Sequence, residues 1–322
     1  MRTKGNLVPF FKVGVAVLII YIMIEKNLFN PEDLLKTITL SELFFCVVLV
    51  LLGIYLSALR WSLLLHGQGF NISMKNVFKL QLVGLFFNFV VPGGVGGDLV
   101  KGYYLVKQND DRKFLAATSI VMDRLLGLWT IVLLVVASGP LIGNDIMENP
   151  KLSYTYRGVV IAGTIFTTML LIGFSDRFYD SGWMFKKFGS LPYGKAVVES
   201  YAAVHAYCTK LTVIGKAVVL SIFLQISSIV FFYVVGNSMG INMSIGAYMF
   251  LVPLGFVASS LPITPGGIGI GQMAFFALFN TYLGTQSQLG PNSITLYQII
   301  CFVFGLGGGY IYLTTKQHEP IH

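Results

Sequence analysis

Two apolar stretches of the sequence contain charged residues, and both have the side chains needed to recognise an anion. In NFVVPGGVGGDLVKGYYL (88–105), Asp98 and Lys101 are three residues apart, which on a helix is about one turn. In SIVMDRLLGLW (119–129), Asp123 and Arg124 are adjacent. Adjacent helix residues point about 100° apart, so we expect these two side chains to pair with other partners and not with each other.

The surroundings of these charges indicate a membrane. The 322 residues are 55% hydrophobic and 11% charged, with a mean hydropathy of +0.75. Several apolar runs reach the roughly 20 residues that cross a bilayer core. Charges at that depth are costly, so they normally pair and face a polar cavity. Our hypothesis is that Arg124 reaches Asp98 or a lipid phosphate, which its fork of donors suits. A purely structural ion pair is the alternative.

Glycine-rich loops occur twice, as PGGVGG at 92–97 and PGGIGIG at 265–271. Proline ends a helix and glycine reaches backbone angles that other residues avoid. Irregular backbone at membrane depth is tolerated where protein buries it or water lines it. Since the motif recurs, we interpret both loops as parts of one site, although a kink or tight helix packing would also explain each alone. Asp98 then lies at the positive end of a restarting helix, either as a cap or as a functional group.

Several polar and aromatic residues near these loops have plain structural explanations. Asn88, Gln81 and Gln272 are amides whose default role is an interhelical hydrogen bond. Tyr104 fits an interface aromatic as well as a binding residue. Arg60 and Trp61, in SALRWSLLL, are interpreted most simply as an interfacial anchor.

Other kinds of chemistry find little support. The four histidines and three cysteines show no metal-ligand spacing, and no Ser-His-acid or paired-carboxylate arrangement can be argued. No GK[ST] follows either glycine loop, so a phosphate-binding loop for nucleotides is excluded. We therefore expect no catalytic residues, no metal and no cofactor, and we do not expect an enzyme.

The elements that must position the charges are helices. The apolar runs are continuous and do not alternate, which argues against a barrel. We predict an all-α polytopic membrane protein, as one domain over 1–322, with six full transmembrane helices and two Gly/Pro-broken, re-entrant hairpins. The helices are predicted at 8–25, 42–65, 113–139, 156–174, 212–236 and 292–315, and the hairpins at 75–107 and 245–284.

Lysine and arginine orient these elements, because cytoplasmic loops carry the excess of both. Both termini and the basic loop at 175–211 are predicted to be cytoplasmic, and that loop is expected to lie along the membrane surface. Gly69 is predicted inside and Ser287 outside. The segments 42–139 and 212–315 then contain the same elements in opposite orientation. Inverted repeats with corresponding broken segments are typical of transporters, which bind substrate where the breaks meet.

The motifs FFNFVVPGGVGGDLVKGYYL, VMDRLLGLW and LPITPGGIGIGQ resemble those of the lysylphosphatidylglycerol synthase transmembrane region family, also called flippase-like or UPF0104 proteins. The resemblance covers nearly the whole chain. It implies movement of an anionic or aminoacylated phospholipid, or of a glycolipid, between leaflets. Many members have Glu where this chain has Gln272, so this chain lacks a negative charge that those members carry. The aminoacyl-transferase domain of bifunctional members is also absent, so synthesis of lysylphosphatidylglycerol is not expected.

Together these inferences predict a lipid flippase or scramblase of a bacterial or archaeal cytoplasmic (inner) membrane, which shelters a phospholipid or glycolipid head group in a polar groove. A non-transporting partner that presents lipid to a glycosyltransferase or aminoacyltransferase is the alternative. A lipid-synthesising enzyme and a second copy of the chain are possible partners; nucleic acid is not. The predicted substrate-binding residues are Asn88, Pro92, Gly96, Gly97, Asp98, Lys101, Tyr104, Asp123, Arg124, Pro265, Gly266, Gly267, Gly269 and Gln272.

Overall fold

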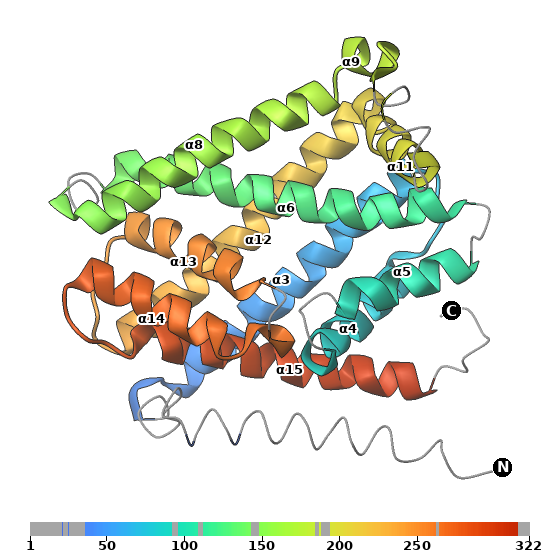
Figure 1. The fold of residues 1–322 in the computed structure, drawn as a ribbon. Helices are drawn as coiled ribbons and strands as arrows, with labels where there is room; N and C mark the ends of the chain where they lie inside the picture. Colours follow the sequence, from blue (N-terminus) through green and yellow to red (C-terminus); the bar gives the residue numbers. More distant parts are fainter. Residues whose placement is uncertain are drawn as a thin grey trace.

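The structure is a computed structural model that describes residues 21, 25, 36–91, 96–108, 112–142, 148–183, 187, 194–261 and 264–314. Within these ranges the regular structure is entirely helical (Figure 1). Five stretches are long and apolar enough to cross a membrane: Leu40–Gly67, Lys113–Ile142, Pro150–Gly173, Val198–Ser238 and Leu289–Thr314. The polytopic helical class is therefore confirmed. The predicted first helix at 8–25 lies outside the described residues, apart from Tyr21 and Glu25.

The first group of helices contains α3 (Leu40–Gly67), α4 (Met74–Val90), α5 (Gly96–Gln108) and α6 (Lys113–Ile142). A capping box starts α3, in which the backbone N–H of Thr39 donates to Glu42 and Thr39 Oγ1 accepts from the N–H of Glu42. The predicted hairpin at 75–107 is thus two helices, with a break between Val90 and Gly96. Four residues of that break, including Pro92, lie outside the described part of the chain.

The second group contains α12 (Leu211–Ser238), α13 (Ile245–Ser259), α14 (Ile270–Leu283) and α15 (Leu289–Thr314). A short 3-10 turn, η3 (Pro265–Gly267), precedes α14. Serine side chains cap the first helix of each hairpin, Ser73 for α4 and Ser244 for α13. The hairpin predicted at 245–284 is therefore also a pair of helices joined by a glycine-rich break.

Three pairings across the groups hold the molecule together (Figure 1). Helices α3 and α12 lie side by side along most of their length, α4 packs on α15, and α13 packs on α6. Buried apolar side chains of α3, α12, α13, α14 and α15 form the largest core cluster. The two groups consequently share one core.

The remaining elements connect the two groups. Helix α8 (Pro150–Gly173) packs on α6, and its apolar side chains Ile161, Ile165, Met169 and Leu171 are exposed, as expected for a surface in contact with lipid. The segment predicted as a basic loop at 175–211 contains the short helices α9 (Asp176–Asp180), α11 (Gly194–His205) and η2 (Cys208–Lys210).

Candidate functional site

A cavity of about 460 Å³ lies between the two groups of helices and receives side chains from α3, α4, α5, α6, α12, α13 and α15. We call it the charged cleft. Its ionised lining residues are Arg60, Lys101, Arg124, Asp98 and Asp123. Three bases against two acids give a net charge of +1, and all five come from the first group. The second group contributes uncharged polar side chains, namely Gln225, Ser228, Ser260 and Tyr297.

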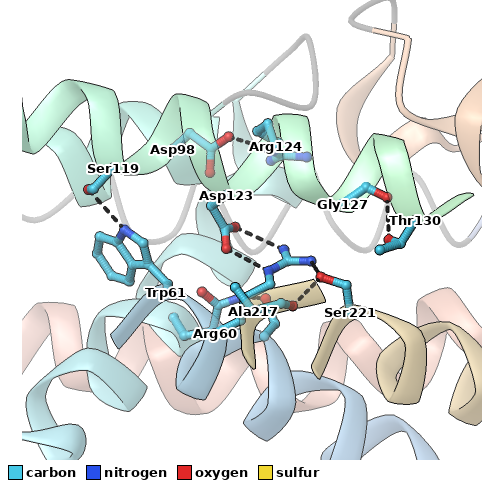
Figure 2. Close-up of polar contacts among 12 residues, drawn as sticks. Arg60, Trp61, Asp98, Ser119, Asp123, Arg124, Gly127, Thr130, Ala217 and Ser221 are labelled. Carbon is cyan, nitrogen blue, oxygen red and sulfur yellow. Dashed lines mark hydrogen bonds and ion pairs between the residues drawn. The ribbon is translucent and has the colours of Figure 1, made fainter. Parts of the chain in front are cut away.

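Asp98 and Arg124 meet in the charged cleft, as the hypothesis required (Figure 2). Arg124 Nε donates to Asp98 Oδ2 at 2.6 Å, and Lys101 Nζ lies 3.4 Å from Asp98 Oδ1. Asp98 is in the first turn of α5, where the positive end of the helix dipole also favours a carboxylate. Its side chain is 16% exposed, whereas that of Arg124 is 54% exposed. The arginine is therefore the open member of the pair.

Lys101 is held deep in the same wall. Its Nζ donates to Gln81 Oε1 at 3.0 Å and lies 5.0 Å from the centre of the Trp61 ring, a cation–π distance. Gln81 in turn donates to Ser57 Oγ at 3.0 Å. With 9% of its side chain exposed, Lys101 contributes a fixed positive charge and has little freedom to move toward a ligand.

Arg60 and Asp123 form a second, buried ion pair. Arg60 Nε and Nη2 donate to the two oxygens of Asp123 at 2.7 and 3.0 Å, and Arg60 Nη1 donates to Ser221 Oγ at 2.8 Å. The three hydrogen bonds of Arg60 therefore link α3 to α6 and to α12 (Figure 2). The interpretation of Arg60 and Trp61 as an interfacial anchor is wrong, because they are only 8% and 1% exposed.

As expected, Asp123 and Arg124 pair with different partners. They point to different sides of α6, so Asp123 joins α6 to α3 through Arg60, while Arg124 pairs with Asp98 on α5 (Figure 2). Asp123 lines the cleft, but both of its oxygens are already occupied by Arg60.

The glycines of the first loop allow α4 and α5 to approach closely. A Cβ on Gly97 would collide with the carbonyl oxygen of Gly84, and one on Gly96 would lie 2.6 Å from the carbonyl oxygen of Phe87. The N–H of Gly97 donates to Asn88 Oδ1 at 2.8 Å. Asn88 and these glycines therefore fix Asp98 in the cleft wall. Pro92 lies outside the described residues.

The second loop lies behind the cleft wall. Gln272 is completely buried: its Oε1 accepts from the N–H of Gly269 at 2.6 Å, and its Nε2 donates to Gln298 and Thr295. Gln298 donates to the carbonyl of Gly266.

Helix α4 contacts η3, and a Cβ on Gly266 would lie only 2.7 Å from the Phe89 ring, near the end of α4. None of the second-loop residues predicted to bind substrate, Pro265, Gly266, Gly267, Gly269 and Gln272, lines the charged cleft.

Two further differences concern single residues. Tyr104 is 7% exposed and belongs to a core cluster with Trp61 and Phe70, away from the cleft lining. Gln225, which the sequence interpretation did not select, lines the cleft from α12. The available signal was an amide in the middle of the apolar run FLQISS. Among the described residues, no group of three His, Cys, Asp or Glu side chains is arranged to hold a metal ion.

Comparison with known proteins gives one family. The sequence model of the family described as the lysylphosphatidylglycerol synthase TM region matches residues 10–309 of this chain. A UPF0104 membrane protein of Methanothermobacter thermautotrophicus is 22% identical over 94% of this chain and 92% of its own length. Another from Methanocaldococcus jannaschii is 34% identical, but over 30% of this chain and 26% of that protein. No solved structure gives a significant match.

Proposed function

The chain belongs to the lysylphosphatidylglycerol synthase TM region family, and from that premise we propose that it moves a lipid between leaflets through the charged cleft. The observation that carries the proposal is Arg124, an exposed guanidinium on the candidate membrane span α6 that is tied to Asp98 by one nitrogen only. Intramembrane charges of this kind mark substrate pathways. The acyl chains would stay in the bilayer, so only the head group needs shelter. We expect an anionic, aminoacylated or glycosylated lipid.

An inverted repeat would give this pathway its two alternating states. The two groups contain corresponding elements in the same order, and the cross-pairings exchange roles: α4 with α15 corresponds to α13 with α6, while α3 pairs with its own counterpart α12. This arrangement supports two re-entrant hairpins of opposite orientation, which are typical of transporter folds. We place the termini and the basic 175–211 segment on the cytoplasmic side of the inner membrane, following the distribution of basic residues.

The test is lipid flux in liposomes that contain the purified full chain. Arg124→Ala should reduce flux roughly tenfold to a hundredfold, which is the range for a lost charged hydrogen bond of about 1.5–3 kcal/mol. Arg157→Ala is the matched control, since Arg157 is exposed on α8 and far from the cleft lining. Asp98→Ala, with Asp180→Ala as its control, should also lower flux because Asp98 orients Arg124.

The outcomes separate the candidate functions. Equal flux for Arg124→Ala and the natural sequence would refute the site. Absence of flux for every candidate lipid, with lipid still bound, would favour a partner that presents lipid to another enzyme. A new lipid product formed by the chain alone would indicate an enzyme.

A further inference from the structure

We infer that the charged cleft selects an anionic lipid whose head group carries hydroxyl groups but no amine, and that it discriminates against aminoacylated lipids. The inference rests on the proposed function and narrows its substrate class. The family description alone points the other way, toward a lysine-bearing head group.

Both acids of the cleft are already occupied. Asp123 gives its two oxygens to Arg60 at 2.7 and 3.0 Å, and Asp98 gives one oxygen to Arg124 and the other to Lys101. Among the described lining residues no third carboxylate exists. The nearby segments 92–95 (PGGV) and 262–263 (PI) contain no ionisable side chain. An ammonium group in this cleft would therefore find no unpaired acid among the described residues, and it would face a net positive wall.

Hydrogen-bond donors, in contrast, are available on the same wall. Arg124 uses only Nε toward Asp98, and its two terminal amino groups have no hydrogen-bond partner in the described part of the chain. Asn88 uses its carbonyl oxygen toward Gly97, which leaves its amide Nδ2 without a described partner. Guanidinium and amide N–H groups are suited to the oxygens of a phosphate. This part of the cleft fits the phosphate group that glycerophospholipids share.

The opposite wall has a different chemistry. Gln225, on α12, lines the cleft, is only 7% exposed, and has no hydrogen bond to any described residue. Ser228, one turn further on, donates to the carbonyl of Leu224 and lies beside Tyr297. The Gln225 amide therefore faces the cleft with its donor and acceptor groups open to a ligand, and a ligand that offers both donors and acceptors can pair with both. Hydroxyl groups meet this requirement, whereas an ammonium group offers only donors.

A head group with its phosphate at Arg124 and its hydroxyls at Gln225 therefore spans the two walls. Phosphatidylglycerol has this chemistry. Phosphatidic acid has the phosphate without the hydroxyl-bearing extension. Lysylphosphatidylglycerol adds two amines, which changes the net charge of the head group from negative to positive. Comparing phosphatidylglycerol with lysylphosphatidylglycerol tests recognition of charge. Comparing it with phosphatidic acid tests recognition of the hydroxyl groups.

The experiment measures competitive lipid binding to the full chain by native mass spectrometry, with flux in liposomes as a second readout. We expect phosphatidylglycerol to be retained at least about tenfold over lysylphosphatidylglycerol, because the amines of the latter would lie against like charges in the cleft. Gln225→Leu should weaken phosphatidylglycerol about threefold to tenfold, the value of one neutral hydrogen bond, and leave phosphatidic acid unchanged. Gln286→Leu, exposed and outside the cleft, is the control.

Each result has a distinct meaning. Equal or tighter binding of lysylphosphatidylglycerol would overturn the inference even if flux is observed. The expected order of binding without any flux would refute the transport function and leave the inference intact. A Gln225→Leu variant that melts like the natural protein but weakens both anionic lipids equally would refute the assignment of hydroxyl recognition to Gln225.

Discussion

The ion pair between Arg60 and Asp123 is the contact whose loss should most affect folding. Both side chains are at most 10% exposed, and three hydrogen bonds of 2.7–3.0 Å join the guanidinium to Asp123 and Ser221. These bonds connect the C-terminal third of α3 to α6 and to α12. Removing the carboxylate leaves a buried guanidinium that keeps only one neutral acceptor.

Asp123→Ala should therefore lower the free energy of unfolding by about 3–5 kcal/mol, the usual cost of breaking a buried pair from one side. The loss combines two or more charged hydrogen bonds, each worth about 1.5–3 kcal/mol, less whatever water can restore. Ser221→Ala removes one acceptor and should cost less, about 1–2 kcal/mol. The double variant Arg60→Met, Asp123→Leu removes both charges, so we expect it to recover most of the stability.

Unfolding in mixed micelles of increasing SDS content measures these free energies for the natural chain and the three variants. Asp180→Ala, an exposed acid on α9, serves as the control for loss of a carboxylate. The reasoning fails if Asp123→Ala costs less than about 1 kcal/mol, or if the double variant is less stable than Asp123→Ala. Either result would mean that water or another side chain neutralises Arg60.

Two other predictions concern packing and topology. In α15, a Cβ on Gly308 would collide with the carbonyl oxygen of Leu82, while Gly307 has no atom within 4 Å of that position. Gly308→Ala should therefore separate α15 from α4 and greatly reduce the yield of folded protein, whereas Gly307→Ala should be neutral; equal yields would refute this packing. For topology, Asn71→Cys and Gln286→Cys are exposed positions. An impermeant thiol reagent should label the first only from the cytoplasmic side and the second only from outside, and labelling of both from one side would refute the inverted repeat.

The sequence predicted the long helices well because their signal is local. The predicted helix at 42–65 is observed at Leu40–Gly67, and that at 212–236 at Leu211–Ser238. Continuous apolar runs fix the helix, and polar residues such as Thr39 and Glu42 fix its start. Asp98 was one of the two partners predicted for Arg124, the other being a lipid phosphate, since charges within an apolar span normally pair.

Predictions failed where one local pattern fits two tertiary surroundings. Arg60 next to Trp61 matches an interfacial anchor, and only the approach of α6 and α12 shows that it is buried. Gln272 follows a glycine loop much as Asp98 does, yet it caps α14 from inside the core. Which face of a helix meets the cavity depends on helix–helix packing, and this is not encoded in spacing along a single helix.

The two groups of helices contribute different chemistry to the cleft, although they contain corresponding elements. If two related halves build one cavity, nothing requires both to bind the same part of a ligand. Here the first half holds all five ionised side chains of the cleft, and the second half holds amide and hydroxyl groups around Gln225. A ligand that touches both walls must be charged at one end and neutral but polar at the other. The second loop can then be a purely structural support. Its glycine Gly266 allows close packing against Phe89, and the amides of Gln272 and Gln298 beside the loop hydrogen-bond to each other. Under the proposed function, two groups of helices that have corresponding packing but carry the charges of the cleft in one group only would suit a lipid head group with a single phosphate.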